Sequence, residues 1–399
     1  MLDLYATDKL RGLYPRVKKY LETEIYPIEL SLLNKPFFEV EKILRAKKRE
    51  VEDLGIWNAY HEEKHGGPGL NLMEVAQLGE LLATTPFGHF LCNCQAPDAG
   101  NIELLIRYAS PEMRKKFLDP LLSGEIRSCF SMTEPEFAGS HPVDMGTTAF
   151  RDGDEYIING HKWFTSSADG AAFAIVMCIT NPEEANPYRR ASMIIVPTDT
   201  PGFKLVRNIP VMGHPGEGWA SHAEIIYQQV RVPVSNLIGP EGSGFQLAQE
   251  RLGPGRIHHC MRWIGICERS FSLMCRRAAT RDMGDGDKLG DKQMVQQMIA
   301  ESRAEIDAAR LMVLHTAYTM ETKGHRAAAQ EISTIKFFVA GILQKVVDRA
   351  IQIHGALGMT DDTILSWWYR EERAARIYDG PDEAHKASLA RKILKEYKN

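Results

Sequence analysis

Residues 376–386 (RIYDGPDEAHK) place three carboxylates and a histidine within one short stretch. Asp379 precedes a Gly-Pro step, and Asp382 and Glu383 follow it. Acidic residues at a helix start interact favourably with the helix dipole, so Asp382 and Glu383 are consistent with a helix N-terminus. A carboxylate enclosed by apolar groups becomes more basic and can remove a proton from another group. The residues alone leave both interpretations open, an acidic helix start or a general base.

A second stretch, residues 129–142 (CFSMTEPEFAGSHP), combines the hydroxyls of Ser131, Thr133 and Ser140 with a Gly-Ser pair. Such a loop can offer N–H and O–H donors to a polar ring edge or to a phosphate. The alternative interpretation is a plain connector between a helix and a strand.

A third stretch, residues 159–170 (NGHKWFTSSADG), carries Trp163 and Thr165 two positions apart. In a regular strand these two side chains share a face. An aromatic ring beside a hydroxyl could stack on a planar ring and donate a hydrogen bond to it. The alternative is a core tryptophan.

The composition excludes several classes of protein. The 399 residues are 44% hydrophobic and carry a net charge of −4, which argues against a nucleic-acid or anionic-membrane surface. No run reaches about 18 apolar residues, so no transmembrane helix is expected. The N-terminus reads as an amphipathic helix without the apolar core of a signal peptide. The seven cysteines show no CxxC pair, which predicts buried thiols in a reducing compartment and no zinc site.

Three blocks position these stretches. Residues 1–127 look helical, and Ser110-Pro111 is typical of a helix start. Residues 128–240 contain β-branched runs bounded by turns, with Asn159-Gly160 predicted as a hairpin turn. Residues 241–399 return to helical periodicity, and Gly355 is predicted to end a long helix.

A search for nucleotide-binding and hydrolase motifs finds none. The sequence contains no GxGxxG after a strand, no GxxxxGK[ST], no GxSxG and no HExxH. A cofactor, if the chain uses one, must be held in another way.

Four segments together resemble the acyl-CoA dehydrogenase family: MTEPEFAGS (132–140), GHKWFTS (160–166), QIHGALG (352–358) and RIYDGPDEAH (376–385). The resemblance covers nearly the whole chain. NCQAPDAGN (93–101) and RLGPGRIHHCMR (251–262) are similar to one branch, which in animals is fused to a phosphotransferase-like domain.

The resemblance implies an α+β multidomain fold. Its parts are an N-terminal α-helical domain (1–127), a middle antiparallel β-barrel domain (128–240) and a C-terminal α-helical domain like a four-helix bundle (241–399). It also implies a homodimer or homotetramer that binds FAD and passes electrons to an electron-transferring flavoprotein. The implied reaction, as in fatty acid β-oxidation, converts an acyl-CoA thioester to trans-2-enoyl-CoA.

By position in the family, the base that removes the α-proton is Asp379, where the family usually carries Glu. Aspartate is shorter by one methylene, about 1.5 Å of reach. Some family members carry a base just before an arginine on the first helix of the C-terminal block. That pair corresponds to Gly255-Arg256, and glycine cannot act as a base.

The resemblance further implies cofactor and substrate contacts. Arg281 is placed like the arginine that reaches a neighbouring subunit's FAD, although the loop after it is rich in Gly and Asp instead of carrying the usual Phe-Gly. The implied cofactor contacts are Phe130, Met132, Thr133, Gly139, Ser140, Trp163, Thr165, Arg281, Gln352, Gly355, Pro381 and Glu383. The implied substrate contacts are Ser140, Arg256 and Gly380.

Other functions fit the same architecture. An acyl-CoA oxidase or a nitroalkane oxidase would return its electrons to O2, and a flavin-bound protein without catalysis is a third alternative. A cytoplasmic location is expected, or the mitochondrial matrix or peroxisome in a eukaryote. The sequence leaves the acyl chain open.

Overall fold

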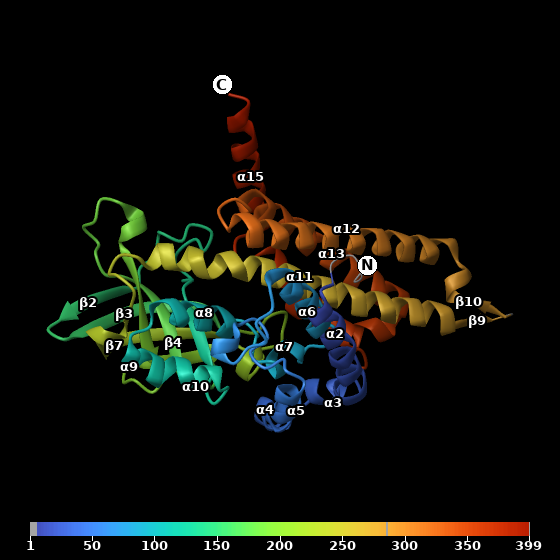
Figure 1. The fold of residues 1–399 in the computed structure, drawn as a ribbon, viewed down its shortest axis with the longest axis horizontal. Coiled ribbons are helices and arrows are strands. Elements are labelled where there is room, and N and C mark those ends of the chain that lie inside the picture. The colour runs from blue at the N-terminus through green and yellow to red at the C-terminus, as the bar shows by residue number, and fades with distance from the viewer. Residues whose placement is uncertain (1–5, 285, 399) are drawn as a thin grey trace. The chain divides into compact units, whose positions relative to one another are not determined.

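The computed structural model describes residues 6–284 and 286–398, so the first five residues of the predicted N-terminal helix lie outside the described part (Figure 1). The chain divides into two compact units. The helical unit comprises Met1–Lys35, Leu44–Cys92 and Gly255–Asn399, and the sheet unit comprises Pro36–Ile43 and Asn93–Pro254. The three domain boundaries drawn from the sequence remain predictions.

The sheet unit is built on eight strands in the order β6-β7-β3-β2-β4-β5-β8, with β1 paired to β4. Their bounds are β1 Ser128–Ser131, β2 Thr148–Asp152, β3 Glu155–Ser166, β4 Phe173–Ile179, β5 Ala191–Pro197, β6 Phe203–Asn208, β7 His222–Pro233 and β8 Leu237–Ile238. The prediction of a middle β domain is confirmed and refined. The pairs β1–β4 and β2–β4 are parallel, so the sheet is mixed and not purely antiparallel.

Strand β4 is buried along its whole length, and its side chains alternate between two apolar clusters. Phe173, Ile175 and Met177 join the cluster that includes Phe117 and Leu121. Ala174, Val176 and Cys178 join the opposite one. The first cluster is covered by α8 (Asp98–Tyr108), α9 (Pro111–Met113), the π-helical turn Arg114–Leu118 and α10 (Asp119–Leu122). Ser110 caps α9 as predicted, since its hydroxyl accepts a hydrogen bond from the Met113 N–H.

The predicted turn at Asn159-Gly160 is wrong, because both residues lie inside β3. The register of β3 against β7 shifts between Ile158 and Gly160, so the pair forms an irregularity within a long strand. A Cβ on Gly160 would lie 2.2 Å from the Thr147 hydroxyl oxygen, so glycine serves a close approach there. The turn between β2 and β3 falls earlier, at Gly153 (φ +60°).

The helical unit contains α2 (Asp8–Tyr20), α3 (Glu29–Leu33), α5 (Lys48–Asp53), α6 (Leu72–Leu82) and α7 (Gly88–Leu91). Its C-terminal part contains most of α11 (Gly244–Thr280), then α12 (Gln293–Lys323), α13 (Ala329–His354), α14 (Ile364–Glu372) and α15 (Asp382–Glu396). The hairpin of β9 (Asp282–Gly284) and β10 (Asp287–Lys288) joins α11 to α12. Helix α4 (Phe37–Ala46) begins in the sheet unit.

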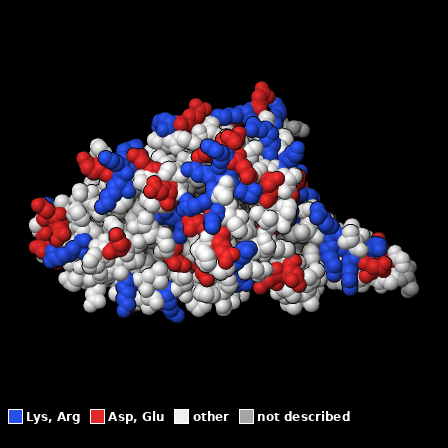
Figure 2. All heavy atoms as spheres, turned by 90° about the horizontal axis from the view of Figure 1, so that it is seen from below, with Lys and Arg blue, Asp and Glu red and all other residues white. Residues whose placement is uncertain are grey.

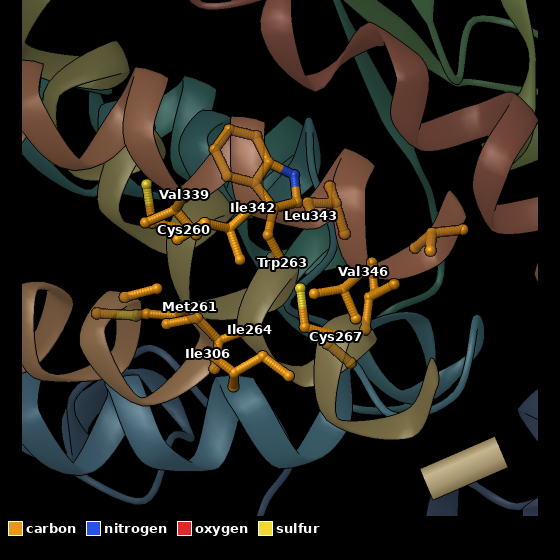
Figure 3. Packing of buried hydrophobic residues seen from close by; sticks show 14 of the residues in the cluster. Cys260, Met261, Trp263, Ile264, Cys267, Ile306, Val339, Ile342, Leu343 and Val346 are labelled. Carbon is orange, nitrogen blue, oxygen red and sulfur yellow. The ribbon is translucent and has the colours of Figure 1, made fainter. Parts of the chain in front are cut away.

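The core of the helical unit lies where α11, α12 and α13 meet. Trp263 of α11 is fully buried among apolar side chains that include Ile342 and Leu343 of α13 (Figure 3). The helical periodicity predicted for this block is seen in α12, which is buried at Val295, Ile306 and other positions along the helix. Helix α13 ends at His354, and Gly355 follows with φ +65°, as the sequence predicts.

The face in Figure 2 carries lysine and arginine side chains interspersed with acidic ones. Within the described ranges, no helix is both long and apolar enough to cross a membrane. The seven cysteines, all within the described residues, form no disulfide bond, and six of them are buried. The described residues contain no group of three or more His, Cys, Asp or Glu side chains arranged to hold a metal ion.

Candidate active site

Asp379 lies in the short connection between the 3-10 turn Arg373–Arg376 and α15. Its backbone is left-handed, with φ 54°, and Gly380 follows with φ 97°. Aspartate tolerates this conformation better than most residues because its short polar side chain bonds locally, and glycine adopts it without steric cost. The loop thus turns sharply at the residue that the resemblance implies as the base.

Two side chains from distant helices hold the Asp379 carbonyl. Arg256 Nε of α11 donates to this oxygen at 3.1 Å, and His385 Nε2 of α15 lies 3.1 Å from it. A Cβ on Gly380 would come within 2.9 Å of His385 Nε2, so the glycine is also needed for this contact. The loop backbone is therefore fixed from both sides.

The Asp379 carboxylate lies against α11. Its Oδ2 is 3.4 Å from His259 Nε2, and a Cβ on Gly255 would lie 3.6 Å from the same oxygen. Gly255 and His259 are four residues apart and so lie on one face of the helix. The Asp379 side chain is only 17% exposed. Asp379 thus lies beside Gly255, the residue that stands where the resemblance implies a second base position and that cannot itself act as a base.

Sequence reasoning missed several side chains around this loop. The Tyr378 hydroxyl accepts hydrogen bonds from Arg262 and from Trp263 Nε1, each at 3.0 Å, and Arg262 is paired with Glu372. The His259 ring stacks on Trp263 and packs against Tyr378, with ring centroids 5.9 and 4.8 Å apart. The available signal was HHCMRW (258–263), which continues the face of Gly255 along α11 by steps of four.

The two later acids of the loop differ from each other. Both begin α15 as predicted, and Glu383 is exposed. Asp382 is only 2% exposed, because its Oδ2 accepts from Arg376 Nε at 2.7 Å and its Oδ1 lies 3.9 Å from Lys336 Nζ. The interpretation of Asp382 as an ordinary helix-start acid is therefore incomplete, since it also belongs to a buried ion pair.

In the sheet unit, the first two predicted cofactor segments lie side by side. The Thr133 hydroxyl donates to the Trp163 carbonyl at 2.8 Å, and the Trp163 N–H donates to the Thr133 carbonyl at 3.0 Å. Phe130 lies beneath the Arg251 guanidinium, at 4.0 Å from its ring centroid. Met132 offers its carbonyl to buried Lys162, and Gly139 and Ser140 are exposed.

The prediction that Trp163 and Thr165 share a face assumed a regular strand, and β3 is irregular at these residues. The register of β3 shifts between Lys162 and Thr165, and Phe164 adopts φ 50°. This bulge turns Trp163 to the side of exposed Phe164, at 5.1 Å between ring centroids. Thr165 is fully buried, and its hydroxyl lies 3.0 Å from that of Ser131.

Each of the two units carries groups suited to contact a part of a flavin nucleotide. In the sheet unit, Trp163 and exposed Phe164 pack together, and Gly139 lies against Thr133, which is hydrogen-bonded to Trp163. An aromatic surface near exposed polar donors suits a planar ring. In the helical unit, Arg281, Gln352 and Gly355 are exposed at helix ends, and a cation with amide donors suits a pyrophosphate. Pro381 caps α15, and its side chain makes no capping hydrogen bond.

Three histidines of the helical unit lie near the site, of which His61 and His89 are buried and His258 is partly buried. Burial lowers the pKa of His61 to about 4 and that of His258 to about 4, and it also lowers the pKa of His89 well below its ordinary value. The Tyr60 hydroxyl lies 2.7 Å from His89 Nε2, and the Tyr60 ring packs against His258. These imidazoles are therefore neutral in the folded protein near pH 7.

The lowered pKa of His61 predicts acid sensitivity. An unfolded histidine titrates near pH 6.5, so between that pH and about 4 the unfolded chain binds more protons than the folded chain. The free energy of unfolding therefore decreases as the pH is lowered through this range. The expected slope is roughly 1.4 kcal/mol per pH unit for this residue. Urea unfolding at pH 6.5 and pH 5 measures it, and His61→Gln should remove roughly 2 kcal/mol of the drop. An unchanged slope in this variant would contradict the assignment.

The sequence and the fold of this chain are similar to those of known proteins. The N-terminal, middle and C-terminal domains of acyl-CoA dehydrogenase match residues 7–125, 129–230 and 242–394. The chain is 44% identical to the probable acyl-CoA dehydrogenase FadE2 of Mycobacterium tuberculosis, over 90% of this chain and 87% of that protein. It is 39% identical to acyl-CoA dehydrogenase family member 11 of Gallus gallus over 97% of this chain, and it spans only about half (51%) of that longer protein.

Solved structures agree with the sequence matches. The acyl-CoA dehydrogenase of Geobacillus kaustophilus superimposes with a TM-score of 0.81 at 27% identity, over 98% of this chain and 99% of that one. A Mycobacterium abscessus structure carrying the same family name reaches a TM-score of 0.93 at 36% identity, over 98% and 99% of the two chains. The chain therefore belongs to the acyl-CoA dehydrogenase family and is an oxidoreductase with FAD as its cofactor.

Proposed function

We propose that this enzyme oxidises an acyl-CoA thioester to the trans-2-enoyl-CoA and that Asp379 is the base. The observation that carries the proposal is the placement of the Asp379 carboxylate, only 17% exposed and held over the Cβ-free surface of Gly255. The α-hydrogen of a thioester is weakly acidic, so its removal needs a carboxylate with little access to water. FAD, when bound, accepts the hydride that leaves the β-carbon.

The fixed backbone of the loop supports a second role. Charge develops on the thioester oxygen as the α-proton leaves, and prepositioned N–H donors stabilise it. Family resemblance assigns one such donor to the backbone N–H of the base residue. Arg256 and His385 hold the adjacent carbonyl from two helices, which keeps this peptide segment in one orientation. Gly380 leaves the backbone accessible to a thioester.

Arg256 has two roles in this proposal, since it holds the base loop and also contacts CoA as predicted from the resemblance. Its Nε holds the base loop, and burial lowers the pKa of its guanidinium, although an arginine remains charged. The other guanidinium nitrogens of Arg256 are N–H donors of the kind that binds a polar part of CoA. Ser140 of the sheet unit is exposed and remains a proposed substrate contact.

Partners follow from the same reaction. Electron-transferring flavoprotein is the proposed acceptor, and a homodimer or homotetramer is the proposed assembly, with Arg281 contributing to FAD in the neighbouring subunit. Exposed Arg281 stands at the start of the β9–β10 hairpin, which Figure 1 draws at the far end of α11 and α12. Leu289 directly follows β10, and its partly buried side chain packs on the core of the helical unit.

The test is anaerobic flavin reduction. The protein should purify yellow with about one FAD per chain, and a panel of straight and branched acyl-CoA thioesters should bleach the flavin absorbance. Reduced enzyme should then stay reduced in air until electron-transferring flavoprotein is added. Rapid reoxidation by O2 would favour the oxidase function instead. Protein that takes up no FAD, or flavin that no acyl-CoA bleaches, would refute the proposal.

A further inference from the structure

The orientation of the Asp379 carboxylate is important because this side chain is short for the proposed base. A glutamate reaches one methylene further than aspartate, so Asp379 has less freedom to find its substrate. The terminal torsion of an aspartate is broad, and a carboxylate in a loop can rotate. Some neighbouring group must fix its orientation if the shorter side chain is to be an efficient base.

His259 is the described side chain placed to do this. Its Nε2 is 3.4 Å from Asp379 Oδ2, and both side chains are mostly enclosed, at 18% and 17% exposure. Catalytic hydrogen bonds in structures without substrate are often long and shorten in the complex. The imidazole is itself held, since its ring stacks on Trp263 and packs against Tyr378. Trp263 and Tyr378 are joined by a hydrogen bond of 3.0 Å.

We propose that His259 is a positioning residue for the reaction, whose Nε2–H holds Oδ2 of Asp379 and so keeps the carboxylate oriented toward the α-proton of the substrate. This inference rests on the proposed function, because it needs Asp379 as the base. Both the neutral Nε2–H tautomer and the imidazolium can donate this bond. The proton removed from the α-carbon ends on the carboxylate, and the electron pair of the broken C–H bond enters the new C=C bond.

Other charged groups surround the same carboxylate, and they define what His259 alone contributes. Arg256 of α11 and His385 of α15 bind the Asp379 carbonyl, not its carboxylate oxygens. Lys336 of α13 acts on Asp379 through its charge but is nearest to Asp382. His89 of α7 interacts electrostatically with His259, which contributes to the lowered pKa of His89. His259 is thus in contact with a carboxylate oxygen of Asp379, whereas Arg256 and His385 bind the backbone.

The test compares His259→Phe with His259→Gln in FAD-loaded, full-length enzyme. The substrate is the acyl-CoA that reduces the wild-type flavin fastest, and the flavin reduction rate is measured from pH 5 to pH 9. Phenylalanine keeps the ring between Trp263 and Tyr378 but removes the donor, so the plateau rate should fall about 10- to 100-fold. The acidic limb should move up by about one pH unit, because a lost donor destabilises the ionised carboxylate. Glutamine keeps an N–H donor and should restore the acidic limb and most of the rate.

A matched control is His258→Phe, on the next residue of α11, whose ring packs against Tyr60. It should leave the pH profile of flavin reduction unchanged. His259→Leu replaces His259→Phe if the latter fails to bind FAD. Wild-type rate and acidic limb in the donor-free variant, with Asp379→Asn inactive, would overturn the role of His259 and leave the proposed function standing. Equal slowing in His259→Phe and His259→Gln with no movement of the limb would also overturn it, as a packing effect. Full activity in Asp379→Asn would overturn both.

Discussion

Asp379→Asn should slow flavin reduction by a good acyl-CoA by about 10²–10⁴-fold, the usual contribution of a positioned general base. Asparagine keeps the size of the side chain but cannot take the α-proton. It also tolerates the left-handed backbone at this position, φ 54°, as well as aspartate does. The contacts of the loop carbonyl with Arg256 and His385 involve the backbone, so the fold of the loop should persist. Stopped-flow absorbance under anaerobic conditions measures the effect.

Cofactor binding separates this result from general damage. The FAD content of Asp379→Asn should equal that of the wild type, because the side chain is proposed to address substrate. Glu383→Gln tests the neighbouring acid, since Glu383 is exposed on the first turn of α15. Because the resemblance implies that Glu383 contacts the cofactor, flavin reduction by this variant is measured in FAD-saturated enzyme. Normal flavin reduction by Asp379→Asn, together with loss in Glu383→Gln, would move the base to Glu383.

Asp379→Glu restores the residue that is usual in the family, but at some cost to this loop. The longer side chain fits the left-handed backbone less well, and it must fit against Gly255, where even a Cβ would lie 3.6 Å from Oδ2. Over-packing of this kind costs about 1–3 kcal/mol. Partial activity with an altered preference among acyl chains is the expected outcome.

The sequence predicted what depends on local patterns or on a motif. The long helices α12 and α13, the stop at Gly355 and the capping by Ser110 follow from periodicity and cap chemistry, and the structure has all of them. The predicted hairpin turn at Asn159-Gly160 was wrong because the same dipeptide occurs both in tight turns and where another segment closely approaches a strand. Only the position of Thr147, brought near by the fold, decides between the two.

The surroundings of the base were beyond local patterns for the same reason. His259 and Asp379 are 120 residues apart, and their contact depends on how α11 passes the loop before α15. Likewise, nothing near Asp382 in the sequence reveals that Lys336 of α13 will be buried beside it. The bulge at Trp163 and Phe164 also needs the partner strand β7, whose register no single segment specifies.

Asp382→Asn should lower the free energy of unfolding by about 3–5 kcal/mol at pH 7, because it breaks one side of a buried ion pair. The side chains of Asp382 and Lys336 are 2% and 1% exposed, and their charged atoms are 3.9 Å apart. In the described structure, Lys336 Nζ makes no hydrogen bond, so removing the nearby carboxylate leaves an ammonium with little compensation. Equilibrium urea unfolding of the FAD-free and FAD-loaded protein measures the loss.

The pH dependence and a double variant identify the cause of this loss. Burial already lowers the pKa of Lys336 below its ordinary value. Between that lowered pKa and about 10.4 the folded chain binds fewer protons than the unfolded chain, so the free energy of unfolding rises with pH. Without Asp382 the pKa should fall further, and the deficit of Asp382→Asn should shrink between pH 7 and pH 9.5. Lys336→Met combined with Asp382→Asn should recover most of the lost stability, since an apolar replacement of a buried pair is often neutral. A deficit that is independent of pH and persists in the double variant would instead point to Arg376, whose hydrogen bond to Asp382 is lost in both.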